Sequence, residues 1–246
     1  MRSLLALCAL LSISFAALPT SPLSRVKSGA GASAPDVFVE YATLNIDHFN
    51  ANGHSETFKN RVLINAKHWD RENGPIFFYA GNEGEVWAFY NNSGFMTETL
   101  AKEFKALVVF AEHRYFGESM PFGKDSYEPK NLPFLSVEQV MADYVEIARQ
   151  VRFYAEDETR PIVLFGGSYG GMLASWLRMK FPETFQGAIA SSAPILYFKG
   201  KTEPNAFYRV VTDAYRKADQ QCPAKVQKVQ AMLMEHASEK SLYGLI

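Results

Sequence analysis

Residues 162–172, Ile-Val-Leu-Phe-Gly-Gly-Ser-Tyr-Gly-Gly-Met, decide the fold. The apolar run 162–165 predicts a buried strand, and residues 172–179 predict a helix. Between them, residues 166–170 match G-x-S-x-G, a turn that presents a nucleophilic serine between a strand and a helix. The turn is so tight that the serine's neighbours must lack side chains, and its strained backbone exposes the serine oxygen. The motif therefore predicts that Ser168 is a nucleophile on an α/β fold.

The same turn predicts how a tetrahedral intermediate would be stabilised. The backbone N–H of Tyr169, at the start of the helix, is a candidate oxyanion donor. The glycine-rich loop 80–84 follows the third predicted strand, where this kind of fold provides a second N–H, so Gly81 or one of its neighbours is the second candidate. In that loop Glu83 is a weaker candidate for binding a substrate amine. The alternatives are a plain βα loop at 80–84 and a glycine-rich turn with an incidental serine.

Composition limits the classes of function. The 246 residues are 48% hydrophobic and 21% charged, which is typical of a globular chain with enough apolar material for a core. The net charge of −1 gives no reason to expect nucleic acid or an anionic membrane surface as a partner. No group of residues has metal-ligand spacing and no glycine-rich turn matches a nucleotide fingerprint, so we expect neither a metal nor a cofactor.

The N-terminus predicts entry into the secretory pathway. A short positive start, Met1-Arg2, precedes an apolar run over residues 4–15, and small residues precede a cut after Ala16. The run is too short to span a bilayer, and no other stretch approaches ~20 apolar residues, so we expect no membrane span. Residues 1–16 are therefore a predicted signal peptide, with secretion or the lysosome as destination.

Two further features fit this route. Asn91 begins an Asn-Asn-Ser acceptor sequence for an N-glycan, although short acceptor sequences often stay unused. Cys8 leaves with the signal peptide, so Cys222 becomes the single cysteine of the mature chain. A single cysteine in a secreted protein suggests an intermolecular bridge or a partner outside the chain.

Strand and helix patterns alternate along the rest of the sequence. Residues 17–36 predict a flexible leader or pro-segment, 37–197 an α/β core with a largely parallel sheet, and 198–246 the start of a helical cap. The core has the order of an α/β-hydrolase through its sixth strand, with the nucleophile after the fifth. Strands are predicted at 37–46, 61–69, 75–79, 106–111, 162–165 and 187–190. Helices are predicted at 95–104, 136–154 (with a capping box of Ser136 and Gln139), 172–180, 207–219 and 224–240.

A catalytic histidine is hard to find in this sequence. In the fold the triad runs Ser, then an acid, then His, and downstream of Ser168 the sequence holds only His236. The pattern favours a helix-flank histidine there, and solvated positions for Asp213 and Asp219. The upstream histidines, 48, 54, 68 and 113, would need a different chain order. His113 is the best of them, but its setting in Glu112-His-Arg-Tyr-Phe-Gly-Glu118 favours loop anchoring over general-base work.

Several segments resemble one family in its own order over about residues 40 to 200. They are Ile46-Asp-His-Phe-Asn50, Pro75-Ile-Phe-Phe-Tyr-Ala-Gly-Asn-Glu-Gly84, Asn91-Asn-Ser-Gly-Phe95, Val109-Phe-Ala-Glu-His-Arg-Tyr-Phe-Gly-Glu-Ser119, Pro121-Phe-Gly123, Glu138-Gln139, Phe165-Gly-Gly-Ser-Tyr-Gly-Gly-Met172 and Ala190-Ser-Ser-Ala-Pro-Ile195. This set resembles the serine exopeptidases of the lysosomal Pro-X carboxypeptidase and dipeptidyl peptidase II family.

The resemblance implies a function. It implies that Ser168 is the nucleophile, that the Tyr169 N–H is an oxyanion donor and that the substrates are peptides cleaved after proline, from either end. It also implies a helical cap over the site and is compatible with a homodimer. An esterase or lipase on the same fold and a non-catalytic binding protein are the alternatives.

The sequence departs from the family pattern at its C-terminal end. The family's catalytic aspartate and histidine, its last strands and most of its cap would lie beyond Ile246, as would a partner for Cys222. We therefore expect this chain alone to be truncated and nearly inactive. We also expect an open sheet edge that favours association.

Overall fold

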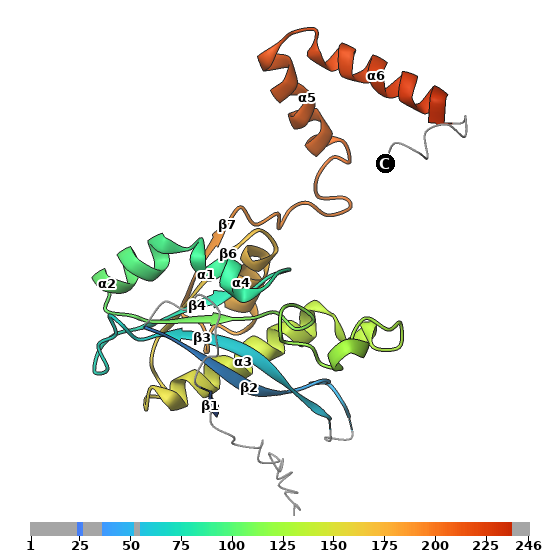
Figure 1. Ribbon diagram of the computed structural model, residues 1–246. Helices are drawn as coiled ribbons and strands as arrows, with labels where there is room; N and C mark the ends of the chain where they lie inside the picture. Colours follow the sequence, from blue (N-terminus) through green and yellow to red (C-terminus); the bar gives the residue numbers. More distant parts are fainter. Residues whose placement is uncertain (1–23, 27–35, 52–54, 238–246) are drawn as a thin grey trace, which may run out of the picture. The chain divides into compact units, whose positions relative to one another are not determined.

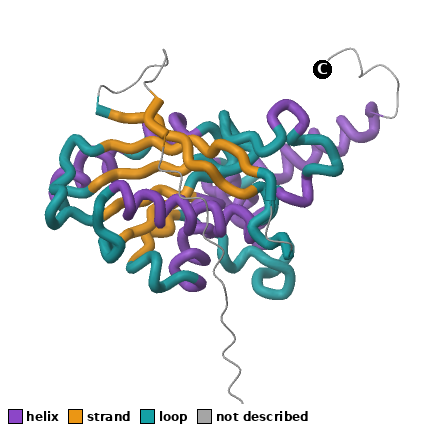
Figure 2. Tube along the Cα trace, turned by 90° about the horizontal axis from the view of Figure 1, so that it is seen from below, coloured by secondary structure: helices purple, strands orange, loops and turns teal. Residues whose placement is uncertain are grey.

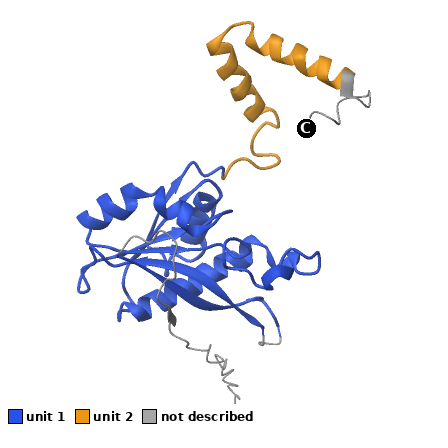
Figure 3. Cartoon of the chain, in the orientation of Figure 1, with its two compact units in different colours: residues 1–194 blue, residues 195–246 orange. Residues whose placement is uncertain are grey.

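The computed structural model describes residues 24–26, 36–51 and 55–237, with side chains from residue 36 to 235 outside the gap. The predicted signal peptide, most of the predicted leader and His54 lie outside the described residues. Figure 3 shows the two compact units of the chain, residues 1–194 and 195–246. Over the described residues, no helix has both the length and the apolar character that crossing a bilayer requires.

The first unit is built on a seven-stranded sheet in the order β1-β2-β3-β5-β4-β6-β7 (Figure 1). Parallel pairing joins β5, β4, β6 and β7, whereas β1, β2, β3 and β5 pair antiparallel in succession. The six strands predicted from residue 37 onward are present, and the α/β-hydrolase fold is confirmed. The strands are β1 Ser24–Val26, β2 Val37–Asn45, β3 Thr57–Asn65, β4 Ile76–Ala80, β5 Leu107–Ala111, β6 Ile162–Gly167 and β7 Gly187–Ser191.

Helices cover both faces of this sheet. In the first unit they are α1 Val86–Asn91, a π-helical turn Phe95–Leu100 that continues into α2 Ala101–Glu103, α3 Val137–Tyr154 and α4 Ser168–Lys180, with short 3₁₀ turns at Gly123–Asp125 and Leu132–Phe134. Alternate side chains along each central strand face opposite cores. On β4, Phe78 packs into the core under α3 and α4, and Phe77 packs into the core under α1 and α2. Figure 2 shows these helices against the strands.

The observed elements differ from the predicted ones in four places. α4 begins at Ser168, four residues before the predicted start at residue 172. β3 lies four residues earlier than predicted, because it pairs with β2 over their whole lengths, from Val37 opposite Asn65 to Asn45 opposite Thr57. The short helix α1 was not predicted. β1 lies in the predicted leader and adds three residues to the sheet beside β2.

The predicted capping box of α3 is only half correct. The Ser136 hydroxyl accepts a hydrogen bond from the Gln139 N–H at 3.3 Å, so Ser136 does cap the helix. The Gln139 side chain does not return this bond. Its amide nitrogen instead donates to Asp47 at 2.6 Å, and its oxygen accepts from the His48 N–H at 2.9 Å. The glutamine therefore ties α3 to the chain after β2.

The second unit contains two helices, α5 Ala206–Ala218 and α6 Cys222–Ala237. The prediction placed them within three residues of these bounds. Their apolar side chains are exposed in the unit itself; on α5 these include Phe207, Val210, Val211 and Tyr215. This is the pattern of amphipathic helices whose apolar face needs another surface.

Candidate active site

Ser168 lies where the turn motif predicts, between β6 and α4. It is the first residue of α4, and its side chain is exposed. Its φ angle is +55°, a left-handed conformation that is rare for a residue with a side chain. Such strain is stored mainly where function needs it, and here it places the hydroxyl outside the sheet at a helix N-terminus.

The glycines around Ser168 explain how the chain makes so tight a turn. A methyl group on Gly166 would lie 2.1 Å from the carbonyl oxygen of Gly170. A methyl group on Gly170 would lie 2.6 Å from the carbonyl oxygen of Ala80, at the end of β4. A methyl group on Gly167, in contrast, would have only the Tyr79 hydroxyl nearby, at 3.8 Å. The motif's glycines at 166 and 170 are thus steric requirements, because backbone occupies the space of their missing side chains.

Tyr169 follows the nucleophile and is held by a histidine. Its hydroxyl is 3.2 Å from Nε2 of His113, and the two ring centroids are 5.5 Å apart. Burial, then the negative charges of Glu83 and Glu138, raise the pKa of Tyr169 to about 12, so the hydroxyl keeps its proton at neutral pH. The backbone N–H of Tyr169 belongs to the first turn of α4, where N–H groups have no partner within the helix. The predicted oxyanion donor is therefore a first-turn N–H next to Ser168.

Gly81 differs from its predicted role. Its N–H donates to the carbonyl oxygen of Ala111 at 3.1 Å, so the group predicted to bind an oxyanion is already used. Its carbonyl oxygen accepts from the Tyr144 hydroxyl at 2.6 Å. A methyl group at this position would lie 2.2 Å from the Ala111 oxygen. Gly81 therefore fixes the loop to β5, and the next residue, Asn82, is the better candidate for the second donor.

Asn82 and Glu83 bring the loop after β4 to the nucleophile turn. The Asn82 side chain is buried against Gly170, on which a methyl group would lie 3.2 Å from its Oδ1. Glu83 is exposed. Its charge contributes to the raised pKa of Tyr169, which places the carboxylate within electrostatic reach of that residue. Sequence reasoning named Glu83 and included Asn82 only as a neighbour of Gly81.

A buried carboxylate anchors this loop and the one after β5. Glu112 is inaccessible to solvent, and its Oε1 accepts from the Val86 N–H at 3.0 Å and from Arg61 at 2.6 Å. Its Oε2 accepts from the N–H groups of Glu118 and Ser119 at 2.9 and 3.1 Å, and from the Ser119 hydroxyl at 2.8 Å. In the 112–118 segment, the predicted loop-anchoring role is therefore performed by the hydrogen bonds of the buried Glu112 carboxylate.

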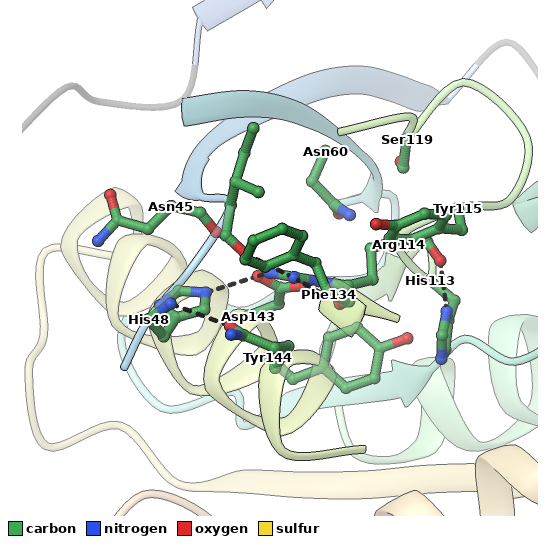
Figure 4. Close-up of polar contacts among 12 residues, drawn as sticks. Asn45, His48, Asn60, His113, Arg114, Tyr115, Ser119, Phe134, Asp143 and Tyr144 are labelled. Carbon is green, nitrogen blue, oxygen red and sulfur yellow. Dashed lines mark hydrogen bonds and ion pairs between the residues drawn. The ribbon is translucent and has the colours of Figure 1, made fainter. Parts of the chain in front are cut away.

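A second buried network surrounds Arg114 and Asp143 (Figure 4). The Arg114 guanidinium contacts both carboxylate oxygens of Asp143 and donates to the backbone oxygens of Asn45, Ile46 and Phe134. The Nε2 of His48 lies 2.7 Å from the same carboxylate. His48 therefore belongs to this structural network. It also faces a groove of about 520 Å³ between β2 and α3, whose lining contains no residue of the nucleophile turn.

The described residues do not complete a catalytic triad around Ser168. No side chain among them is hydrogen bonded to the Ser168 hydroxyl. His113 is bonded to Tyr169 instead, and His68 lies 3.7 Å from Glu98. Asp213 and Asp219 belong to the second unit and contact Arg216 and Lys225, on exposed surface. His236 lies in α6, with its side chain outside the described residues.

Two other predictions concern sites away from Ser168. Asn91 is the last residue of α1, and its side chain is exposed. Cys222, the first residue of α6, is a free cysteine. Among residues 24–26, 36–51 and 55–237, no cluster of three or more His, Cys, Asp or Glu side chains could hold a metal ion.

Sequence comparison identifies the relatives of this chain. The chain is 45% identical to a lysosomal Pro-X carboxypeptidase of Mus musculus over 77% of its own length and 39% of that protein's. For the protein of the same name in Homo sapiens the identity is 42%, over 86% of this chain and 42% of that one. A thymus-specific serine protease of Homo sapiens is 37% identical, over 61% of this chain and 29% of that protein. The chain spans about two fifths of the length of its first two relatives.

A solved structure and a family match complete the comparison. An esterase from Pyrobaculum calidifontis has a TM-score of 0.44 and 17% identity, over 72% of this chain and 50% of that one. The pattern of the serine carboxypeptidase S28 family matches residues 44–242, which is most of the sequence. The chain therefore belongs to the serine carboxypeptidase S28 family.

Proposed function

We propose that Ser168 is the nucleophile of a serine exopeptidase that cleaves peptides after proline. The observation that carries this proposal is the exposed Ser168 with a φ of +55° at the start of α4, in a member of the S28 family. The serine oxygen attacks the carbonyl carbon of the proline, the bond from this carbon to the nitrogen of the next residue breaks, and the amine departs to leave a prolyl acyl-enzyme that water then hydrolyses. A histidine carries the proton, and an aspartate orients that histidine.

The oxyanion of each tetrahedral intermediate is bound by two backbone N–H groups in this proposal. One is the N–H of Tyr169. The other is the N–H of Asn82, because the Gly81 N–H donates to Ala111. Two such donors lower the energy of the transition state by several kcal/mol, about 3 kcal/mol for each donor.

The second part of the proposal concerns which end of the peptide substrate is recognised. The relatives' names favour a Pro-X carboxypeptidase, which removes the residue after a penultimate proline. The exposed carboxylate of Glu83 would instead attract a substrate amine, as in a dipeptidyl peptidase. Both activities use the same nucleophile. Entry into the secretory pathway, a glycan on Asn91 and a lysosomal or secreted destination belong to the same proposal, and the exposure of Asn91 supports the glycan.

Covalent labelling tests the nucleophile. Because no histidine among the described residues is bonded to the Ser168 hydroxyl, a fluorophosphonate probe in large excess should label the chain only slowly, but on Ser168, as located by peptide mapping, and Ser168→Ala should abolish this labelling. Ser175 is a matched control, since it lies two turns along α4 and its hydroxyl bonds the Gly171 carbonyl oxygen at 3.0 Å. Ser175→Ala should label like the original chain. Labelling that persists in Ser168→Ala would overturn the assignment.

Competition against the same label distinguishes the substrate classes. An amino-blocked peptide ending in Pro-Phe, a free-amine Ala-Pro amide and a short acyl ester would each be added before the probe. Protection by the first supports carboxyl-end cleavage, and protection by the second, lost in Glu83→Gln, supports amino-end cleavage. Protection by the ester alone would favour the esterase alternative.

A further inference from the structure

We propose that His113 is a positioning residue for the nucleophile turn: its neutral imidazole accepts the Tyr169 hydroxyl proton and so fixes the Ser168–Tyr169 peptide. This inference rests on the proposed role of Ser168. Three parts of the structure meet at this contact: the loop after β5, the first turn of α4 and the charged loop after β4.

The imidazole can accept a hydrogen bond at only one of its nitrogens. The Nδ1 of His113 lies 2.6 Å from the carbonyl oxygen of Arg114, which can only accept, so Nδ1 carries the proton. The neutral ring then has its lone pair on Nε2, which faces the Tyr169 hydroxyl at 3.2 Å. Burial is the main cause that lowers the pKa of His113, and it favours this neutral form.

The histidine itself is rigidly held. Its side chain is buried, with Phe116 edge-on to its ring at 5.3 Å. The Arg114 carbonyl that fixes its tautomer belongs to a residue whose own side chain is fully buried and bonded to Asp143 and to the Phe134 oxygen (Figure 4). A contact to Tyr169 from so fixed a group adds a polar restraint to a tyrosine ring that already packs, partly buried, against the core.

The restraint matters because Tyr169 is both the partner of His113 and the backbone donor next to Ser168. Its ring is joined to the same Cα as the N–H that would bind the oxyanion. Ser168 has a φ of +55°, so its peptide has other conformations of lower strain available. Small displacements of an oxyanion donor reduce its effect on the transition state, since the donor must meet the developing charge at about 2.7–3.1 Å. One hydrogen bond at the Tyr169 hydroxyl therefore helps to maintain the geometry on which Ser168 depends.

Burial lowers the pKa of His113 and favours the neutral ring, although the nearby carboxylates of Glu83 and Asp143 act in the opposite direction and raise it. Four groups face the ring. They are Glu83 from the loop after β4, Arg114 from its own loop, Asp143 from α3 and Tyr169 from α4. A protonated ring would have hydrogen on both nitrogens and could not accept from Tyr169. The lowered pKa keeps the accepting form populated below neutral pH, where an enzyme of an acidic compartment would work.

Two substitutions of His113 test the roles of its two ring nitrogens separately. His113→Asn keeps a donor near Nδ1 and removes the acceptor at Nε2, whereas His113→Gln can place its oxygen near Nε2. Tyr169→Phe removes only the hydroxyl. The measurement is the rate constant of Ser168 labelling by a fluorophosphonate. We expect His113→Asn and Tyr169→Phe each to slow labelling about tenfold, the effect of one hydrogen bond, and His113→Gln to restore part of the rate. The double variant His113→Asn/Tyr169→Phe should be no slower than either single variant.

The backbone amide resonances of Ser168 and Tyr169 give a second measurement that needs no reactivity. Both should shift in His113→Asn and move back toward the original positions in His113→Gln, while the Ser175 amide stays in place. Unshifted Ser168 and Tyr169 amides in both His113→Asn and Tyr169→Phe would overturn the inference, whether or not the chain is labelled. If His113→Asn does not fold, Tyr169→Phe and His113→Gln decide the question.

Different results would overturn the proposed function of Ser168 and the proposed role of His113. Labelling that persists in Ser168→Ala overturns the function. Labelling that is abolished in Ser168→Ala but unchanged in His113→Asn and Tyr169→Phe, with unshifted amides, overturns only the role of His113.

Discussion

Arg114 and Asp143 form a two-point ion pair in the interior: Nε lies 2.6 Å from Oδ2, and Nη2 lies 2.7 Å from Oδ1. The two side chains are 0% and 1% exposed. Arg114 also donates to backbone oxygens at the end of β2, just after it and before α3. A charge so deeply buried is tolerated only when every partner is present. The pair therefore joins β2, α3 and the loop that contains His113.

We predict that Asp143→Asn destabilises the chain severely, because it leaves the Arg114 charge buried without its counter-ion. The expected loss in the free energy of unfolding is about 3 kcal/mol or more. Urea unfolding followed by circular dichroism measures it. Glu128→Gln is the matched control, since Glu128 pairs with Lys130 on the surface at 2.8 Å, and should change stability by no more than about 0.5 kcal/mol. Equal effects of the two substitutions would contradict the interpretation.

Adjacent glycines of the nucleophile turn should respond very differently to a methyl group. Gly166→Ala would place its Cβ 2.1 Å from the Gly170 oxygen, which is backbone and cannot move without moving α4. We expect a loss of stability of about 3 kcal/mol and no labelling of Ser168. The new Cβ of Gly167→Ala would have only the Tyr79 hydroxyl nearby, at 3.8 Å. We expect this variant to lose up to about 1 kcal/mol of the free energy of unfolding, because alanine is a poor residue at a helix N-cap. Thermal unfolding of both variants tests this, and a Gly167→Ala as unstable as Gly166→Ala would refute the steric argument.

The sequence predicts local structure here better than it predicts contacts. The Gly-Gly-Ser-Tyr-Gly-Gly turn can be predicted from the sequence because its requirements are local: a strand before it, a helix after it and glycines where backbone atoms approach closely. The Ser136 cap was predicted for the same reason. The partner of the Gln139 side chain was predicted wrongly, because Asp47 lies 92 residues away and only the fold brings it near.

The loops after β4 and β5 show the same difference: the sequence predicts their positions but not their contacts with distant residues. The position of Gly81 after β4 was predicted from the strand order, but its N–H bond to Ala111 depends on the register between β4 and β5. Helix α1 was missed because it is only six residues long, half of them aromatic, its N-cap residue makes no side-chain cap and a glycine-rich loop precedes it. The bond between His113 and Tyr169 spans 56 residues. A histidine just after a buried strand, within a charged segment, was its only signal in the sequence.

Acid should weaken the fold through His113. Burial lowers the pKa of this histidine below its ordinary value of about 6.5, so the unfolded chain binds a proton more readily than the folded chain. The stability that comes from the neutral ring is present above about pH 6.5 and is lost as the pH falls toward the lowered pKa. The free energy of unfolding of the original chain, relative to His113→Gln, should therefore shrink between pH 7.5 and pH 5. Tyr169→Phe retains the buried imidazole and should retain the slope, whereas parallel curves for all three chains would contradict the assignment.

Turnover by this 246-residue chain should be very slow even though Ser168 is correctly placed. Among its described residues no imidazole is hydrogen bonded to the Ser168 hydroxyl, because the buried His113 faces Tyr169. Loss of the activating histidine costs on the order of 10⁶ in turnover in a well-studied serine protease, while oxyanion binding alone leaves on the order of 10³ over water. Release of product from proline-linked reporter peptides, compared with Ser168→Ala, measures the difference. A rate typical of an ordinary enzyme would show that a histidine does reach Ser168, and substitution of His236 and of His113 would then identify which one it is.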